Sequence, residues 1–515
     1  MNYFRKQSLF REILLLAVGV FAFIVSFPIA FSKSPFWIEQ LTPFWICIYL
    51  LPLLFHLQRC PRFSFLKAWS FYFLGSMGIL YWIVISMKNY GELSTTLSIS
   101  ALIATCLFRS LFSALAIYLW TKFSSHTNRW MLGVLLLTLQ DYLLHFFPFG
   151  GFPWISPGYA LTPDFYWIQI ADVVGFHGIN ISIYIVTFLL FELKTNTIKK
   201  PYVISLLSFL FVIHLYGIVR LATLPAAKNH PPLQVAWIQG NIGQAMKWNP
   251  QEKRNIIQKY QQLTQTLQTQ PTDLIIWPEA AVPISFSQNN KVIIETKIHN
   301  IHTPIFFGAP SYKKVDQKKY YYNSAFLTDE QGMIIDRYDK IHLVPFGEFL
   351  PSFGFDILKK LPAVAGSFHH GNNPKLMQIK DEFFGTSICY EVLYPHMFKN
   401  LVRDGATFFV NITNDAWFDL SSGPFQHARF AILRAIETRK PLVRVANTGI
   451  SALYHPTGKV ELKSELFTND VKIASVIPNK IKTIYVTTRF LAEAIMIILC
   501  ILIISAWRKK SKYES

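Results

Sequence analysis

Long apolar runs alternate with short polar segments over the first 223 residues, and one further apolar run lies near the C-terminus. A helix that crosses a membrane needs about 20 mainly apolar residues. Eight stretches approach this requirement, at residues 13–31, 40–57, 68–87, 98–121, 130–147, 167–192, 202–222 and 488–507. The pattern predicts a polytopic α-helical membrane domain of about eight spans, of which the second is the weakest because Pro43 interrupts it.

The first apolar run has a second interpretation, as a signal peptide. Arg5, Lys6 and Arg11 precede it, and Ala30-Phe31-Ser32 at its end has the character of a cleavage site. Its apolar stretch is longer than the roughly 7 to 15 residues usual in signal peptides. We therefore expect it to be kept as a span, with cleavage as the open alternative.

Residues 224–485 have a globular composition, with short β-type runs that alternate with amphipathic stretches. Strands are predicted at 233–239, 274–277, 305–308, 324–328, 385–388, 407–410, 442–445 and 451–454, and helices at 251–268, 392–403 and 426–440. Such alternation is typical of an α/β layered domain. The chain thus divides into a bundle of seven spans (1–223), an α/β domain (224–485), and a last span with a basic tail (486–515).

The charges predict how these parts are oriented. Only 15% of the residues are charged, against about 25% in a typical soluble chain, and Lys and Arg outnumber Asp and Glu by 49 to 30. Basic residues gather at alternate span ends: Arg5, Lys6, Arg11, Arg59, Arg62, Lys67, Lys122, Arg129, Lys194, Lys199, Lys200, Arg508, Lys509, Lys510 and Lys512. The positive-inside rule then places both termini in the cytoplasm and the α/β domain outside. Because these clusters lie at membrane edges without interleaved aromatic residues, we do not expect nucleic-acid binding.

Ionisable residues inside the predicted spans are costly in lipid and often have a function. Asp141 lies in the fifth span, Asp172 in the sixth and Glu493 in the eighth, and Arg109 of the fourth span is a candidate partner for one of these acids. Hydrogen bonding between helices and a substrate-facing role both stay open for them.

Cys389 is the lone cysteine of the predicted outer domain, since Cys47, Cys60, Cys106 and Cys500 lie in or beside spans. A lone cysteine cannot form an internal disulfide, so it is either a small buried hydrophobe or a thiol in use. An apolar strand runs into a helix at Cys389. Amide groups at the start of a helix lower the pKa of a thiol, which predicts a thiolate here.

Two other stretches carry candidate catalytic groups. Glu279 follows a buried strand in Leu274-Ile-Ile-Trp-Pro-Glu279, and Lys340 and Glu348 lie in a mostly apolar loop. Each is weak evidence alone, because a charged residue at a strand end is more often a surface group. Together with a thiol they supply a nucleophile, a general base and a positive charge beside an oxyanion.

In this order, the three stretches resemble the carbon-nitrogen hydrolase (nitrilase) superfamily, whose catalytic set is Glu, Lys and Cys. With spans before and after the domain, the chain as a whole resembles the apolipoprotein N-acyltransferase family. Further motifs of the resemblance are Gln239-Gly-Asn241, Trp248, Trp277-Pro-Glu-Ala-Ala-Val-Pro283, Val344-Pro-Phe-Gly-Glu348, Asn414-Asp-Ala-Trp-Phe418 and Gly423-Pro-Phe-Gln-His427. The chain departs from the family at Asp419, where glycine is usual.

The resemblance implies a nitrilase αββα sandwich for the α/β domain. It implies that Cys389 is the nucleophile, Glu279 the general base and Lys340 the charge that stabilises the oxyanion, with help from a backbone amide at Cys389 or Tyr390.

The same resemblance suggests supporting residues. Glu348 and Glu391 are expected to orient Lys340 and its loop, although Glu391 has an equally good interpretation as a carboxylate that the dipole of a helix start stabilises. Trp248 is expected to pack on an acyl chain or a substrate loop.

The reaction that the resemblance implies has two steps. An acyl chain passes from a phospholipid, typically phosphatidylethanolamine, to Cys389 as a thioester, and then to the α-amine of a diacylglyceryl-cysteine apolipoprotein. The implied location is the bacterial inner membrane, with the domain in the periplasm. Cys-x-x-Cys and His-Glu-x-x-His patterns do not occur in the sequence, so we expect no metal and no cofactor.

Two other functions stay open at this point. One is a membrane-tethered amidase or nitrilase that hydrolyses a small amide. The other is a transporter whose outer domain only binds a ligand, although the spans show no evident inverted repeat of the kind transporters often have.

Overall fold

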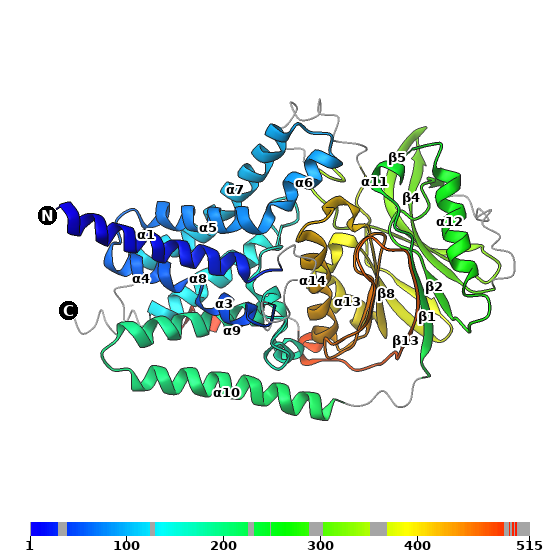
Figure 1. The fold of residues 1–515 in the computed structure, drawn as a ribbon. Coiled ribbons are helices and arrows are strands. Elements are labelled where there is room, and N and C mark those ends of the chain that lie inside the picture. The colour runs from blue at the N-terminus through cyan, green and yellow to red at the C-terminus, as the bar shows by residue number, and fades with distance from the viewer. Residues whose placement is uncertain are drawn as a thin grey trace. The chain divides into compact units, whose positions relative to one another are not determined.

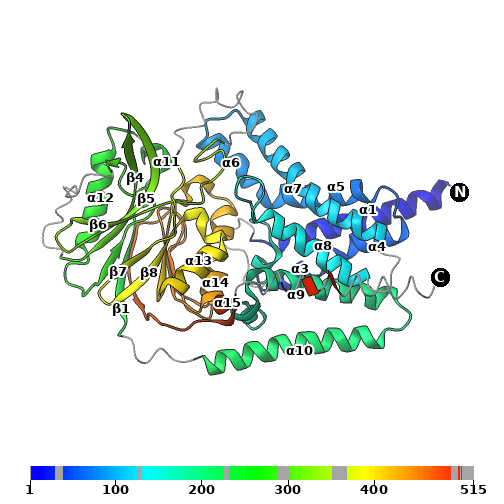
Figure 2. The same ribbon diagram turned by 180° about the vertical axis from the view of Figure 1, so that it is seen from behind.

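The computed structural model of the chain describes residues 2–28, 39–123, 129–224, 231–247, 249–287, 302–350, 368–488, 494, 497–498 and 500–501. Its residues form two compact units. The first comprises Met1–Val84, Ile99–Leu224 and Thr488–Ser515, and the second Ile85–Ser98 and Pro225–Thr487. Figures 1 and 2 show that the first unit is helical and that both sheets belong to the second.

The N-terminal part of the chain is built from helices. They are α1 (Asn2–Val25), α3 (Thr42–Ile48), α4 (Leu51–Arg59), α5 (Ser64–Leu80), α6 (Trp82–Asn89), α7 (Thr95–Phe123), α8 (Arg129–Leu144), α9 (Ala171–Thr195) and α10 (Lys200–Thr223). Among the described residues, three helices are long and apolar enough to cross a membrane, at Thr95–Phe123, Trp167–Thr195 and Lys200–Thr223. Helices α5 and α6, bent by 52°, would form a fourth span if taken together.

The second expected span is divided, but not where the sequence suggested. Pro43 lies in the first turn of α3, where its missing N–H costs nothing, and it begins the helix instead of interrupting it. The break falls at Tyr49 and Leu50, just before Pro52 in the first turn of α4. The eighth expected span lies largely outside the described residues, as does Glu493.

Two buried acids of the helical unit hydrogen-bond between helices. Asp141 of α8 accepts from the Tyr184 hydroxyl of α9 at 2.7 Å. Asp172 of α9 accepts from Tyr216 and Arg220 of α10, at 2.7 and 2.6 Å.

The buried arginine of α7 is bonded differently from the expectation. Arg109 donates to the Ile155 carbonyl oxygen at 3.1 Å and to the Ser76 hydroxyl at 3.5 Å, so its hydrogen bonds within the described residues go to neutral oxygens and not to an acid. The contacts favour interhelical hydrogen bonding as the role of these polar groups.

Two sheets make up the second unit. The first has the order β13-β1-β2-β4-β5-β6, with β3 paired to β4: β1 (Leu233–Gln239), β2 (Leu274–Ile276), β3 (Phe286–Ser287), β4 (Ile305–Val315), β5 (Lys318–Thr328), β6 (Ile334–Asp339) and β13 (Asp470–Val476). The second has the order β12-β11-β10-β9-β8-β7: β7 (Leu376–Ile379), β8 (Glu382–Ile388), β9 (Phe408–Thr413), β10 (Leu442–Ala446), β11 (Ala452–Tyr454) and β12 (Val460–Lys463). In each sheet the central strands are parallel, β1-β2-β4 and β8-β9-β10.

Helices cover the outer faces of the two sheets, so that the unit has four layers, α-β-β-α (Figures 1 and 2). Helix α12 (Lys253–Gln265) packs on the first sheet, with the ring of Tyr260 stacked on Trp277 at 5.2 Å. Helices α13 (Pro395–Asp404) and α14 (Gly423–Thr438) cover the second sheet, where Phe398 contacts Phe409. This is the nitrilase-type sandwich that the sequence resemblance implied.

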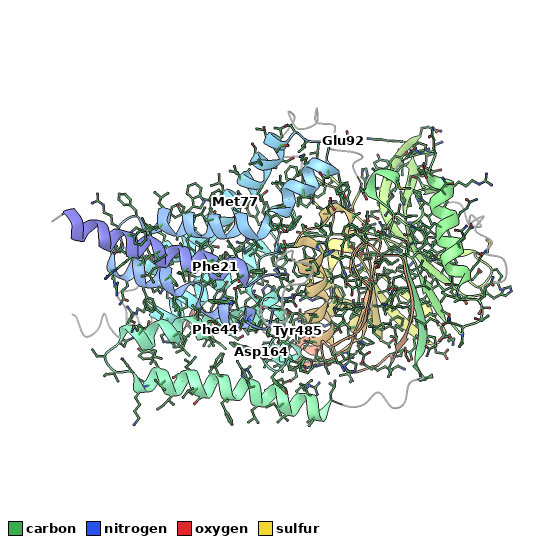
Figure 3. All side chains as sticks on the ribbon, in the orientation of Figure 1. Phe21, Phe44, Met77, Glu92, Asp164 and Tyr485 are labelled. Carbon is green, nitrogen blue, oxygen red and sulfur yellow. The ribbon has the colours of Figure 1, made fainter. Side chains whose placement is uncertain are left out.

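Short helical segments connect these layers. They are α11 (Gln244–Lys247), the 3₁₀ turns η4 (Cys389–Leu393) and η5 (Asp415–Phe418), and α15 (Ile484–Thr487). The ring centroid of Tyr485 in α15, a residue labelled in Figure 3, lies 4.6 Å from Lys399 Nζ in α13. This cation–π contact holds the end of the second unit against its helical layer.

All eight strands expected from the sequence are present, but five more were missed. Strands β4 and β5 are longer than expected and form a hairpin, in which β4 continues to Val315 and β5 begins at Lys318. Strands β3, β6, β7, β12 and β13 are short or lie at the sides of the sheets, where alternation of apolar and polar residues is weak evidence.

Candidate active site

Cys389 lies at the sharp junction between β8 and the 3₁₀ turn η4. Ile388 is extended (φ −117°), whereas Cys389 has φ +52°, a left-handed conformation that is uncommon for a residue with a Cβ. The residue is partly exposed, and Thr413, at the end of the neighbouring strand β9, donates its hydroxyl proton to Asp415 at 3.1 Å. Strained backbone of this kind is often found where a reactive group is presented to a ligand.

The pKa of the Cys389 thiol is raised, opposite to the expected lowering. Burial is the largest cause, and the negative charges of Glu279 and Asp415 add to it, against the opposing charge of Lys340. The single 3₁₀ turn that begins at Cys389 has too few aligned peptides to outweigh these effects. The Cys389 side chain is therefore a neutral thiol, which would need a base before it could act as a nucleophile.

Glu279 is carried by the chain just after β2. Ala280 takes up a left-handed conformation (φ 50°), and Gly308 of β4 lies directly against this turn. A Cβ added to Gly308 would be 2.6 Å from the Glu279 Cα, so only glycine permits the approach.

The Glu279 carboxylate is buried and held at both oxygens. Its Oε1 accepts a hydrogen bond from Asn323 Nδ2 at 2.7 Å and lies 3.5 Å from Lys340 Nζ. Its Oε2 accepts from the backbone N–H of Asn414 at 2.8 Å. These contacts fix the carboxylate in one orientation, as a general base requires.

Lys340 follows β6 and is buried, with two carboxylates beside its ammonium. Glu348 is the nearer, 2.8 Å from Nζ, and Glu279 is the other. Burial by itself lowers the pKa of Lys340, but the charges of Glu348, Glu279 and Cys389 outweigh it, so the pKa is raised. The side chain stays positively charged over the whole physiological range.

Glu348 and Asn323 link Lys340 to Glu279 through hydrogen bonds. Glu348 Oε2 also accepts from the Val344 N–H at 2.8 Å, which closes the loop between Lys340 and Glu348. Asn323 of β5 donates from Nδ2 to Glu348 Oε1 as well as to Glu279, each at 2.7 Å. Sequence reasoning missed Asn323, although an asparagine next to an aromatic strand segment is an unusual choice for a strand.

Glu391 ties the nucleophile turn to the lysine loop. Its Oε1 accepts from the Tyr338 hydroxyl and the Ile341 N–H, both at 2.7 Å, and from the His342 N–H at 3.1 Å. Its Oε2 accepts from the Ile388 N–H at 2.7 Å. These contacts fit both interpretations of Glu391, because Oε1 holds the Lys340 loop and Oε2 caps the start of η4.

The remaining supporting residues stand as follows. Tyr390 is buried, with its ring 5.5 Å from that of Tyr394. Trp248 lies outside the described residues, so its expected packing on an acyl chain stays a prediction.

A buried charged cluster that the sequence did not reveal underlies Cys389. Arg444 Nη2 donates to Asp415 Oδ2 at 2.7 Å, and His427 Nδ1 is 2.8 Å from Asp415 Oδ1. Burial opposes ionisation of Asp415, but Arg444 and His427 prevail and lower its pKa to about 2. Arg444 also holds Asn411, whose Nδ2 donates to the Ser387 hydroxyl of β8 at 3.0 Å. The cluster thus supports the strand β8 that ends at Cys389.

Within the described parts of the chain, no group of three or more His, Cys, Asp or Glu side chains is arranged to hold a metal ion. The site as described offers a thiol, a fixed carboxylate and a permanently charged ammonium. Such a set of groups can form and resolve a thioester by acid–base chemistry.

Both parts of the chain match known families. Residues 234–485 match the family described as carbon-nitrogen hydrolase, and residues 25–189 match the apolipoprotein N-acyltransferase N-terminal domain. An apolipoprotein N-acyltransferase of Geobacter metallireducens is 34% identical over 421 residues, 80% of each chain. One of Vibrio cholerae is 27% identical over 507 residues, 94% of this chain and 95% of that one. The solved structure of Saccharomyces cerevisiae Nit3, of the nitrilase superfamily, covers 48% of this chain and 90% of that one at 17% identity, with a TM-score of 0.37.

Proposed function

Because the chain belongs to the apolipoprotein N-acyltransferase family, we propose that it moves an acyl chain from a membrane phospholipid to the N-terminal amine of a diacylglyceryl-cysteine apolipoprotein, through a thioester on Cys389. One observation carries the assignment of the site. The Glu279 carboxylate and the Lys340 ammonium lie 3.5 Å apart in a buried site, and both are electrostatically coupled to the Cys389 thiol.

In the first step Glu279 takes the thiol proton as the sulfur of Cys389 attacks the ester carbonyl of the phospholipid. Lys340 and a backbone N–H at Cys389 or Tyr390 stabilise the negative charge on the carbonyl oxygen. The C–O bond then breaks, and protonated Glu279 gives its proton to the leaving lysophospholipid alcohol. The acyl chain remains on the sulfur as a thioester.

In the second step the neutral α-amine of the apolipoprotein attacks the thioester carbonyl. Glu279 takes a proton from the attacking nitrogen, the C–S bond breaks, and the proton passes to the sulfur of Cys389. The products are the amide and the free thiol, so the enzyme returns to its starting state. The order of release makes the reaction ping-pong.

We further propose eight spans, a periplasmic domain over 224–485 and cytoplasmic termini in a bacterial inner membrane. The distribution of Lys and Arg supports this topology. So does the segment Ile85–Ser98, which joins the third and fourth expected spans at the outer side of the membrane and belongs to the second unit. There Ser86 Oγ donates to the Trp417 carbonyl oxygen at 2.6 Å, and the ring of Tyr90 contacts Trp417 edge to face.

The decisive experiment follows the acyl group by intact mass. Purified protein incubated with phosphatidylethanolamine should gain the mass of one acyl chain, and a diacylated lipopeptide should remove it and gain the same mass. Cys389→Ala should gain nothing. An adduct that water removes while the lipopeptide stays unchanged would favour the amidase alternative, and absence of any adduct on the wild-type chain would refute the acyltransferase assignment.

A further inference from the structure

Lys247, the last residue of α11, is completely buried beside the turn that carries Glu279. Its Nζ donates a hydrogen bond to the backbone carbonyl oxygen of Glu279 at 3.2 Å. Lysine is rarely buried to this degree unless its charge is compensated. The proposed reaction assigns it no role, so its presence in the site needs a physical reason.

The charges around Glu279 give that reason. Glu279 and Glu348 carry two negative charges, and Lys340 supplies one positive charge between them. Cys389 is a neutral thiol because its pKa is raised. Without another cation this buried group would hold a net negative charge, which is costly in a low-dielectric interior and favours protonation of a carboxylate.

Among the described residues, the elements around Glu279 supply no alternative cation. Asp415 of η5 faces Arg444 of β10, so that pair is balanced within itself. From α11, Gln244 contributes only a neutral amide, which accepts from Asn414 at 2.7 Å. The pKa of Lys247 is lowered to about 7, because the effect of burial outweighs that of the Glu279 charge, which raises the pKa. Among the described residues, Glu279 is the acid whose charge acts on Lys247.

We propose that Lys247 is a positioning residue for the general base: it fixes the backbone of Glu279 and supplies the second positive charge that keeps this carboxylate ionised before the thiol proton is transferred. The inference rests on the proposed role of Glu279. Two lysines then act on one base. Lys340 also faces the oxyanion, and Lys247 contacts the backbone of Glu279.

The test measures single-turnover thioester formation from phosphatidylethanolamine between about pH 5 and 9, by intact mass, in the full-length protein. Lys247→Met removes charge and hydrogen bond, while Lys247→Gln keeps a donor without the charge. Lys253→Met is the matched control, because Lys253 lies on the next helix and no contact with Glu279 is recorded for it. Thermal unfolding in detergent shows whether each variant is folded.

Both Lys247 variants should move the acidic limb of the rate profile upward by about one pH unit. At a pH below the limb, the rate of thioester formation should then fall about tenfold, whereas at a pH above the limb the rate should change little. The sign follows because loss of a nearby cation raises the pKa of a carboxyl group. With its pKa lowered to about 7, Lys247 of the wild-type protein is charged on the acidic side of neutral pH.

If folded Lys247→Met and Lys247→Gln show the acidic limb at the same pH as the wild-type protein, the inference is overturned. The inference is also overturned if the rate of thioester formation falls by the same factor at every pH, since that indicates a structural role alone. If Lys247→Met does not fold, Lys247→Gln carries the same test. Failure of the wild-type protein to form an adduct is a different result, because it refutes the proposed function itself.

Discussion

Asp419 adopts a backbone conformation suited to glycine while its carboxylate reaches Asn89 on another segment of the second unit. Its φ and ψ are 48° and −154°. Its Oδ2 accepts from Asn89 Nδ2 at 3.2 Å, and its Oδ1 accepts from the Leu420 N–H at 2.8 Å. The position at which the sequence resemblance leads us to expect glycine is thus a strained one, and the contact with segment Ile85–Ser98 offsets part of the strain.

We expect Asp419→Gly to be more stable than Asp419→Ala by about 1 to 3 kcal/mol, because both variants lose the Asn89 contact and glycine alone relieves the strain. Thermal and denaturant unfolding in detergent measure the difference. Asn89→Ala is the control, since it removes the exposed hydrogen bond and leaves the backbone strain. Equal stability of the glycine and alanine variants would show that the conformation carries no strain.

Asn323→Ala should slow thioester formation about 10- to 100-fold. The substitution leaves one oxygen of Glu279 and one of Glu348 without their shared amide donor, and an unmet buried charge costs about 1 to 3 kcal/mol. Single-turnover rates measured by intact mass report the loss. Tyr322→Phe, at the neighbouring strand position, is the control and should keep the wild-type rate.

Glu279→Gln should abolish thioester formation and yet make Cys389 alkylate faster with iodoacetamide near neutral pH. The Glu279 charge raises the pKa of the thiol, so its removal lowers that pKa and increases the thiolate fraction. Lys340→Met should have the opposite effect on alkylation, because its positive charge lowers the pKa. The labelled peptide that contains Cys389 distinguishes this site from the other four cysteines. Slower alkylation in Glu279→Gln would contradict the coupling.

Asp415 should make the second unit sensitive to acid. Its pKa is lowered from 3.8 to about 2, so the stability it contributes is fully present above about pH 4 and is lost as the pH falls through about 2. The difference corresponds to about 2 kcal/mol. Denaturant unfolding between pH 2 and 5 should show this slope in the wild-type protein and a smaller one in Asp415→Asn.

The free energy of interaction between Asp415 and Arg444 can be measured separately from the pH dependence, with single and double variants. Arg444→Met should destabilise by about 3 to 5 kcal/mol, because it leaves a buried carboxylate uncompensated. The double variant Asp415→Asn/Arg444→Met should be less destabilised than the sum of the single variants. Additive effects would show that the two groups do not interact.

Many strands of the α/β domain could be predicted from the local pattern of apolar residues in the sequence. The mainly apolar runs Leu233–Gln239 and Phe408–Thr413 are buried central strands, and they were predictable because a strand covered on both faces is mostly apolar. The lysine-rich hairpin at Lys313–Lys319 was missed because its pairing comes from the partner strand and not from its own composition. Pro43 was misjudged because proline is tolerated in the first turn of a helix, and the sequence did not reveal where that turn begins.

The sequence by itself determined which chemical groups are available: a lone cysteine after one strand, a glutamate after another, and a lysine with a second glutamate in a loop. The tertiary structure alone decided their electrostatic states. The pKa of Cys389 depends on burial and on Glu279, which is 110 residues away in the chain, and no local rule for a helix start includes that charge. Lys247 and Asn323 likewise gain their roles from contacts between separate elements, because hydrogen bonds and Coulomb interactions act through space and not along the sequence.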